Sequence, residues 1–126
     1  MYLTILDLII LFGIISIYLI FHKYKTKLKI HSLHSDVLLP TIANYYDAGL
    51  NIYLYENEIT IPAKDSISTN TGLTIAIPYG YYGKIMSISN ISFIHGIEVG
   101  AGIINSGFFG EIIILLYNHS NKDVIF

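Results

Sequence analysis

The first hydrophobic feature of the chain is a long run near its N-terminal end, over residues 3–21. Fourteen of these nineteen residues are Leu, Ile or Phe. As a helix the run would be about 28 Å long, close to a bilayer core of roughly 30 Å. Its apolar side chains favour insertion by about 4 to 8 kcal/mol, and Asp7 opposes insertion by at most about 3 kcal/mol. The run predicts one transmembrane helix over residues 1–22, with Asp7 near the membrane surface.

Three other interpretations of this run fit the sequence less well. A cleaved signal peptide starts with positive charge and ends in a small-x-small site, and the run has neither. A buried core helix is usually shorter. An interfacial amphipathic helix needs a polar face, which residues 9–20 lack.

A basic stretch follows over residues 23–39 and predicts a juxtamembrane linker. It is either an ordinary stop-transfer flank or a site of attraction to anionic lipid, at about 1 kcal/mol per lysine. Because no lysine precedes the run, the positive-inside rule places the following domain in the cytoplasm. His31 and His34 have the spacing of a metal pair on a helix, but they lack a carboxylate or cysteine partner. The lysines occupy every second position: Lys23, Lys25, Lys27 and Lys29.

From residue 50 onward the hydrophobic pattern changes to short β-rich runs separated by turn residues. Gly, Asn and Pro mark turns at residues 70–72, 78–80 and 105–107. Short strands spaced in this way predict an all-β sandwich or barrel over residues 40–126. No helical period of useful length is visible there. The predicted strands are residues 50–55, 58–61, 66–69, 73–77, 82–87 and 110–117.

Composition narrows the chemistry of this domain. The chain has no cysteine, which excludes disulfides and thiolate metal sites. From residue 40 onward there are three lysines against seven acidic residues, so nucleic acid is not an expected partner. All seven basic residues are lysines, and the arginine that usually binds phosphate in a bidentate manner is missing.

Three segments of the β domain are similar to the motifs of one family. The first segment is similar to a motif that usually reads Ala-Gly-Tyr-Asp-Leu, and here it reads Tyr46-Asp47-Ala48-Gly49-Leu50-Asn51-Ile52. Ile77-Pro78-Tyr79-Gly80-Tyr81-Tyr82-Gly83-Lys84-Ile85 leads into the second motif. His95-Gly96-Ile97-Glu98-Val99-Gly100-Ala101-Gly102-Ile103-Ile104-Asn105 leads into the third. With these segments the chain resembles the trimeric deoxyuridine triphosphatases over residues 41–126. The resemblance implies a distorted jelly roll, usually assembled as a trimer with shared active sites.

The same resemblance implies where a substrate site lies, and there the charged groups are missing. The first-motif Asp that helps to hold magnesium is Asn51, an amide without charge for a hard cation. The third-motif Asp that activates water is Asn105, which cannot accept a proton, a loss worth about 10²–10⁴ in rate. The chain also stops at Phe126, before the family's fourth motif and its Gly-rich arm. We therefore expect no catalytic residue, no metal and no cofactor. The expected vestigial substrate-site positions are Asn51, Ile88, Ser89, Asn90, Asn105 and Phe108.

Two hypotheses about function follow. The first is a membrane-anchored pseudoenzyme that acts as a protein-binding or structural module, with at most a weak homotrimer. DNA viruses often keep degenerate copies of this kind, and the composition is compatible with an AT-rich viral gene and a host membrane. The second is a nucleotide (dUTP) diphosphohydrolase with a remodelled active site. We expect the first, because phosphate chemistry depends on charged groups and the domain offers only three lysines. His95, Glu98 and Glu111 are expected to be structural or surface residues.

Overall fold

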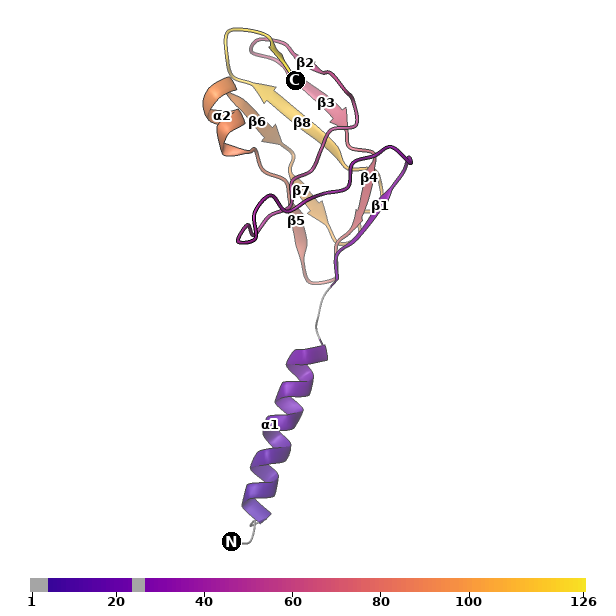
Figure 1. The fold of residues 1–126 in the computed structure, drawn as a ribbon, viewed down its shortest axis with the longest axis vertical. Helices are drawn as coiled ribbons and strands as arrows, with labels where there is room; N and C mark the ends of the chain where they lie inside the picture. The colour runs from indigo at the N-terminus through magenta and orange to yellow at the C-terminus, as the bar shows by residue number, and fades with distance from the viewer. Residues whose placement is uncertain (1–4, 24–26) are drawn as a thin grey trace.

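The computed structural model describes residues 5–23 and 27–126, and within these ranges almost all regular structure beyond the first helix is β-strand (Figure 1). One short helix, α2, interrupts the strands between β5 and β6. The elements in chain order are α1 (Ile5–Lys23), β1 (Lys29–Ser32), β2 (Thr60–Ile61), β3 (Ser66–Asn70), β4 (Leu73–Ala76), β5 (Tyr82–Lys84), α2 (Ser89–His95), β6 (Ile97–Gly100), β7 (Ile103–Asn105), β8 (Ile113–Asn118) and β9 (Val124–Ile125).

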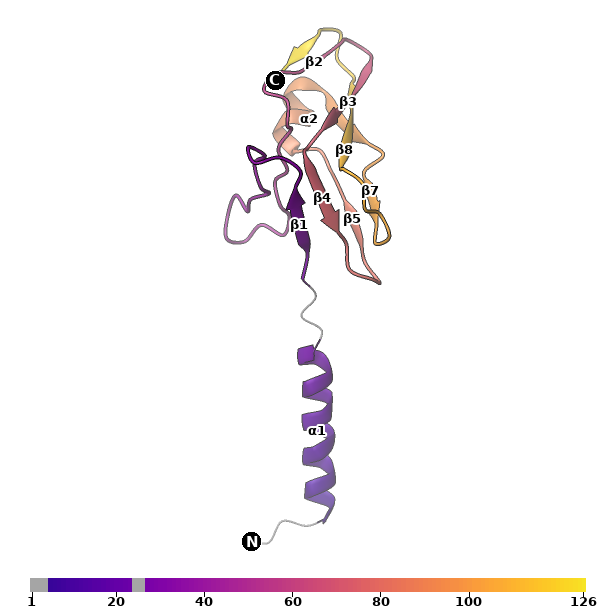
Figure 2. The ribbon, with the colours of Figure 1, turned by 90° about the vertical axis from the view of Figure 1, so that its right-hand side faces the viewer.

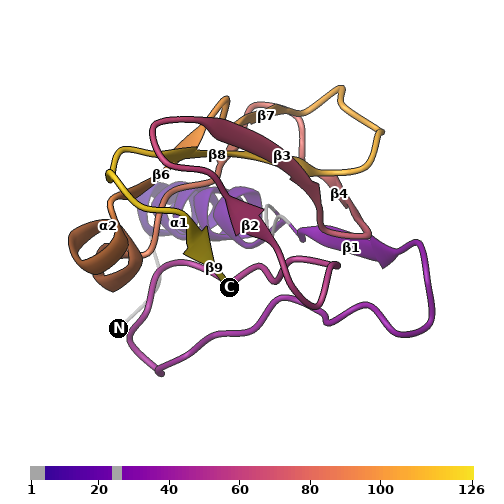
Figure 3. The same cartoon turned by 90° about the horizontal axis from the view of Figure 1, so that it is seen from above.

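The strands form small antiparallel sheets that enclose one core. The largest described sheet has the order β3-β8-β6, and the pairs β1-β4, β2-β9 and β5-β7 surround it. In the view from above, β3 and β8 run side by side across the domain, and the paired strands β2 and β9 lie next to them, beside the C-terminus (Figure 3). The prediction of an all-β domain is confirmed.

The core is built mainly from isoleucine, placed by the two-residue period of the strands. In β8 the alternation buries Ile114, Leu116 and Asn118 and leaves the residues between them nearer to solvent. Such alternation lets one face of a strand join the core and the other face water. The buried hydrophobic residues that cluster together are Ile59, Ile61, Ile75, Ile77, Ile97, Ile104, Ile112, Ile114, Leu116 and Val124.

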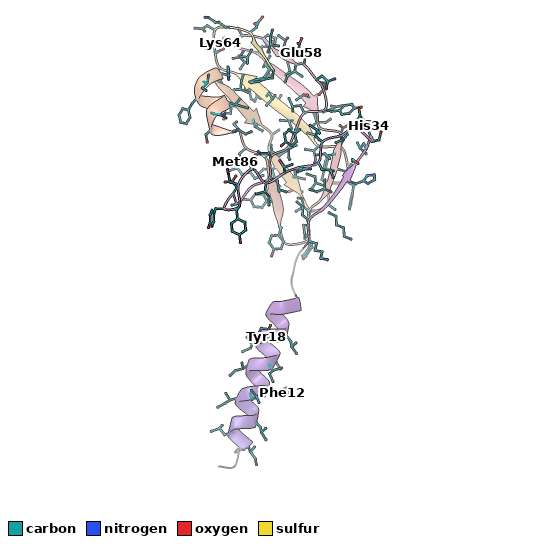
Figure 4. All side chains as sticks on the ribbon, in the orientation of Figure 1. Phe12, Tyr18, His34, Glu58, Lys64 and Met86 are labelled. Atoms are coloured by element: carbon teal, nitrogen blue, oxygen red, sulfur yellow. The ribbon has the colours of Figure 1, made fainter. Side chains whose placement is uncertain are left out.

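The helix α1 stands apart from the β domain, and its drawn side chains project outward (Figures 1 and 4). Phe12 and Tyr18, for example, are 74% and 62% exposed. Asp7 and Lys23 bracket an uncharged stretch of only fifteen residues, 8–22. A helix of that length spans about 22 Å, less than the roughly 30 Å of a bilayer core.

Within residues 5–23 and 27–126, no helix is both long enough and apolar enough to cross a membrane. The predicted transmembrane helix over residues 1–22 is therefore corrected, and with it the single-pass membrane location and the cytoplasmic orientation that depended on this helix. Residues 1–4 of the predicted span lie outside the described residues.

The strand predictions succeed in part. The predicted runs 58–61, 66–69, 73–77, 82–87 and 110–117 correspond to β2, β3, β4, β5 and β8, with shifted ends. The run 50–55 forms no strand; its Asn51 makes one isolated bridge with Thr41. The sequence shows no helical period of useful length after residue 40, so the short helix α2, of seven residues, was not predicted. Gly96 ends α2 in the left-handed conformation, at φ 68°, which glycine adopts without strain.

The stretch predicted as a linker, residues 23–39, contains a strand. Lys29 to Ser32 form β1, which pairs with β4 along one side of the domain (Figure 2). His31 lies on this strand, and the His34 ring stacks on Tyr55 at a centroid distance of 5.0 Å. The described part of this stretch therefore packs against the β domain.

Candidate functional site

The first-motif position, Asn51, is held by backbone pairing. The Asn51 N–H donates to the Thr41 carbonyl at 2.8 Å, and the Thr41 N–H donates to the Asn51 carbonyl at 3.1 Å. Both main-chain groups are therefore occupied, and the side-chain amide is the polar group that Asn51 has to offer. Asn51 lies on the wall of a cavity of about 410 Å³, which we call the motif cavity.

The second-motif segment runs along the same cavity. Ile88, which the family resemblance places where the second motif has its phosphate-binding arginine, lines the motif cavity together with Ser87 and Asn51. The Ser87 hydroxyl oxygen accepts a hydrogen bond of 2.8 Å from the Val99 N–H, which fixes the segment to β6. The structure thus brings the first and second motif positions together within one chain.

Ser89 and Asn90 are the first residues of α2, and neither lines the motif cavity. Ser89 lines a second, more open cavity of about 600 Å³, which we call the α2 cavity. The Asn90 side-chain oxygen accepts a hydrogen bond of 2.8 Å from the N–H of Ile91, so this amide is used locally. The segment Lys84 to Ser87 contributes to the walls of both cavities and separates them.

The third-motif positions lie on the β7–β8 connection. Asn105 ends β7 opposite Tyr82 of β5, and its carbonyl accepts a hydrogen bond of 3.0 Å from the Phe108 N–H. The Phe108 ring lies over Gly110, where an added Cβ would be only 2.8 Å from the ring. Phe108 is 43% exposed, and neither Asn105 nor Phe108 lines either of the two cavities. Asn105 and Phe108 therefore lie outside the walls of both cavities.

One pair of ionisable groups was not expected to belong to the site. The His119 Nε2 atom lies 2.7 Å from Glu98 Oε2, and both side chains line the α2 cavity. The pairing of β6 with β8 creates this contact, because Glu98 stands opposite Tyr117 and His119 follows two residues later. Sequence spacing alone could not reveal it, since the two residues are 21 positions apart.

His95 and Glu111 have contacts that fit the structural roles expected for them. The His95 ring packs edge-to-face on Phe126 at 5.4 Å. The Glu111 carboxylate accepts a hydrogen bond of 2.8 Å from the N–H of Gly72, in the turn before β4.

The residues around Asn51 do not fit a magnesium ion held by the protein. Magnesium prefers carboxylate oxygens in an octahedral arrangement, and Asn51 supplies a neutral amide oxygen. Over the part of the chain that the structure describes, no group of three His, Cys, Asp or Glu side chains is placed to hold a metal ion.

Together, the fold and the motif positions define an antiparallel all-β domain with polar segments beside two cavities. The model of the dUTPase family matches residues 35–126. The chain belongs to the dUTPase family.

Curated relatives carry the same family name in full. A deoxyuridine 5'-triphosphate nucleotidohydrolase of Debaryomyces hansenii is 35% identical over 99 residues, covering 79% of this chain and 61% of the relative. The protein of that name in Saccharomyces cerevisiae is 34% identical over 96 residues, covering 76% of this chain and 65% of the relative. The chain thus spans a little less than two thirds of the length of these relatives.

Solved structures share the fold. A dUTPase variant of Staphylococcus bacteriophage 80alpha with dUpNHpp matches with a TM-score of 0.69 at 26% identity, covering 76% of this chain and 62% of that chain. The dUTPase from phage phi11 of S. aureus matches with a TM-score of 0.70 at 24% identity, covering 75% and 61%. The resemblance to this family and its β fold is confirmed.

The relatives contradict the expectation of a pseudoenzyme that serves as a protein-binding or structural module. They are named as hydrolases of deoxyuridine triphosphate, at up to 36% identity over most of this chain. That expectation rested on the neutral residues that replace charged ones at a few motif positions. The sequence similarity to the relatives extends across the whole β domain. The findings favour the alternative, a nucleotide hydrolase, and they support neither a membrane nor a separate protein partner.

Proposed function

We propose that this chain is a deoxyuridine triphosphate nucleotidohydrolase with a remodelled site, releasing dUMP and pyrophosphate. One observation carries the proposal: the family match over residues 35–126 includes all three motif positions and spans β2 to β9 of the β domain. The named activity of the relatives then gives the reaction and the substrate class.

Six positions are proposed to meet the substrate. The Phe108 ring, which is partly exposed above Gly110, offers a face for packing against the sugar. The amides of Asn51 and Asn105 can donate and accept hydrogen bonds, so they can orient phosphate oxygens or a water molecule. The Ser89 hydroxyl can donate to a phosphate oxygen. Ile88 and Asn90 complete the set, Ile88 as an apolar wall of the motif cavity and Asn90 at the start of α2.

We further propose a homotrimer in which neighbouring chains complete each site. The support is the separation of the motif positions: Asn51 and Ile88 share the motif cavity, whereas Asn105 and Phe108 line neither cavity. Exposed apolar side chains are available for such contacts. Phe93 and Ile94 of α2 are 90% and 73% exposed. Burying apolar surface of this kind is the usual driving force for subunit association.

The direct test is to incubate the purified chain with dUTP and to measure dUMP and pyrophosphate. Phe108→Ala should raise the KM for dUTP, because it removes the face that packs against the sugar. Such a change would assign the measured activity to this site and not to a contaminating hydrolase. Tyr79→Ala is the matched control, since Tyr79 is 97% exposed and lines neither cavity. Hydrolysis that is equal in all three proteins, or absent from the wild type, would reject the proposal.

A further inference from the structure

A triphosphate needs positive charge, and the arginine position of the second motif holds Ile88. The compensating charge must therefore come from another residue. Of the described residues that line the motif cavity and the α2 cavity, Lys84 is the only lysine or arginine, and it lines both. It stands at the end of β5, four positions before Ile88.

The Lys84 ammonium is available to a ligand. Lys84 is exposed, and no acidic group in the described part of the chain lies within ion-pair distance of it. The carboxylate on the α2-cavity wall, Glu98, is instead hydrogen-bonded to His119 at 2.7 Å. Lys64, by contrast, already donates to the His119 carbonyl at 2.6 Å and lines neither cavity.

Two hydroxyl groups on the same walls add donors. The Ser87 oxygen accepts a hydrogen bond from Val99, so its own hydrogen is free to donate to an anion. Ser89 lines the α2 cavity and makes no side-chain hydrogen bond to the described residues. Ser92 differs from both, because its hydroxyl already donates to the Ile97 carbonyl at 2.8 Å.

We propose that Lys84, with the hydroxyls of Ser87 and Ser89, forms the binding site for the polyphosphate of the nucleotide. The Lys84 ammonium replaces the positive charge of the arginine that the family has at position 88. The site lies where the motif cavity meets the α2 cavity. The ligand chemistry is a linear polyphosphate anion, carried by a nucleotide or free in solution. The inference rests on the proposed nucleotide hydrolase, but binding measurements test the two separately.

The experiment is calorimetric titration of the full chain with dUpNHpp and, separately, with inorganic triphosphate. Lys84→Met should weaken the binding of dUpNHpp by about 10- to 100-fold, as expected for lost hydrogen bonds to a charged group. Lys84→Arg should retain most of the affinity, because arginine also binds phosphate. Lys122→Met is the charge-matched control, and its affinity should equal that of the wild type. Ser89→Ala should weaken binding less than Lys84→Met, and it serves as a second variant if Lys84→Met folds poorly.

The outcomes separate the two proposals. Equal affinity of Lys84→Met and wild type for dUpNHpp overturns the Lys84 site and leaves the hydrolase intact. If the wild type neither hydrolyses dUTP nor binds dUpNHpp, the proposed function fails. Inorganic triphosphate then decides the Lys84 site: binding that is lost in Lys84→Met supports it, and no binding to the wild type overturns it.

Discussion

The side-chain amide of Asn118 donates a hydrogen bond of 2.9 Å to the backbone carbonyl of Ile61, 57 positions earlier in the chain. The same nitrogen donates to the Lys122 carbonyl at 2.8 Å, and the side-chain oxygen accepts from the Ser120 N–H at 2.9 Å. Asn118 is only 2% exposed. This single side chain therefore ties the end of β8 to β2 and to the turn that leads into β9.

Asn118→Ala should be strongly destabilising. It removes three hydrogen bonds of a buried side chain, and each such bond contributes about 0.5–1.5 kcal/mol. We expect the free energy of unfolding to fall by about 2–4 kcal/mol, measured by urea denaturation. Asn121→Ala is the control, because this exposed residue should change stability by less than about 0.5 kcal/mol. Equal losses in the two variants would contradict the bridging role of Asn118.

Gly102→Ala should disrupt the contact between Ile85, the residue after β5, and Gly102, the residue before β7. The Gly102 carbonyl accepts a hydrogen bond of 2.8 Å from the Ile85 N–H. A Cβ on Gly102 would lie 2.4 Å from the Ile85 carbonyl oxygen, so main-chain atoms would have to move. Gly107→Ala is the matched control, because an added Cβ there meets nothing within 4 Å. Thermal melts should show a clear loss of Tm for Gly102→Ala alone; similar melts would reject this close approach.

The stability of the domain should fall in acid partly because of Glu56. The Thr69 hydroxyl donates to the Glu56 carboxylate, and this bond is the main cause that lowers the pKa of Glu56 from its usual 4.5. A carboxyl whose folded pKa is lowered stabilises the fold above its unfolded pKa and loses that contribution as pH falls through the folded pKa.

Glu56→Gln should therefore flatten the fall of stability below about pH 5, when unfolding is measured at several pH values. The effect will be modest, since Glu56 is largely exposed and solvent screens it. Glu58→Gln is the charge-matched control, because it removes the same charge from an exposed residue whose side chain makes no hydrogen bond to the described residues. Parallel profiles for wild type and Glu56→Gln would contradict the role of the Thr69 bond.

The sequence was sufficient to predict the β class and most strand positions, because alternation and turn residues are local signals. It missed β1, since the lysines at residues 23–29 suggested a solvated flank, whereas Lys29 to Ser32 pair with β4. It also missed α2, whose seven residues are too few to show a helical period. The apolar run of α1 was interpreted from length and hydropathy alone, which do not fix what surrounds a helix.

The candidate site was predictable only at its motif positions. Asn51, Ile88 and Asn105 followed from the family resemblance, but their distribution over separate regions depends on tertiary structure. The Glu98–His119 pair and the placement of Lys84 between two cavities arise from strand pairing between distant segments. No local pattern records such contacts.

Glu98→Gln tests the electrostatics of the α2 cavity. It removes a negative charge from a wall shared with Lys84 and Ser89 while keeping a hydrogen-bonding group near His119. If polyphosphate binds there, affinity for dUpNHpp should rise, by a few-fold at most, because exposed charges act weakly in water. Glu58→Gln is again the charge-matched control. An unchanged affinity in Glu98→Gln would place the phosphates away from this wall.

Asn105→Asp should raise the rate of dUTP hydrolysis. The turn after β7 is held by the Asn105 backbone carbonyl, which accepts from the Phe108 N–H at 3.0 Å, so the turn does not depend on the side-chain amide. Asp has nearly the same shape as Asn and adds a carboxylate that can accept a proton from water. A well-placed general base is worth about 10²–10⁴ in rate, and we expect a gain toward the lower end of that range. Asn105→Ala controls for the loss of the amide alone and should be no faster than the wild type.

The measurement is the initial rate of dUMP release at saturating dUTP. If Asn105→Asp binds dUpNHpp as tightly as the wild type but is no faster, then position 105 does not face the attacking water.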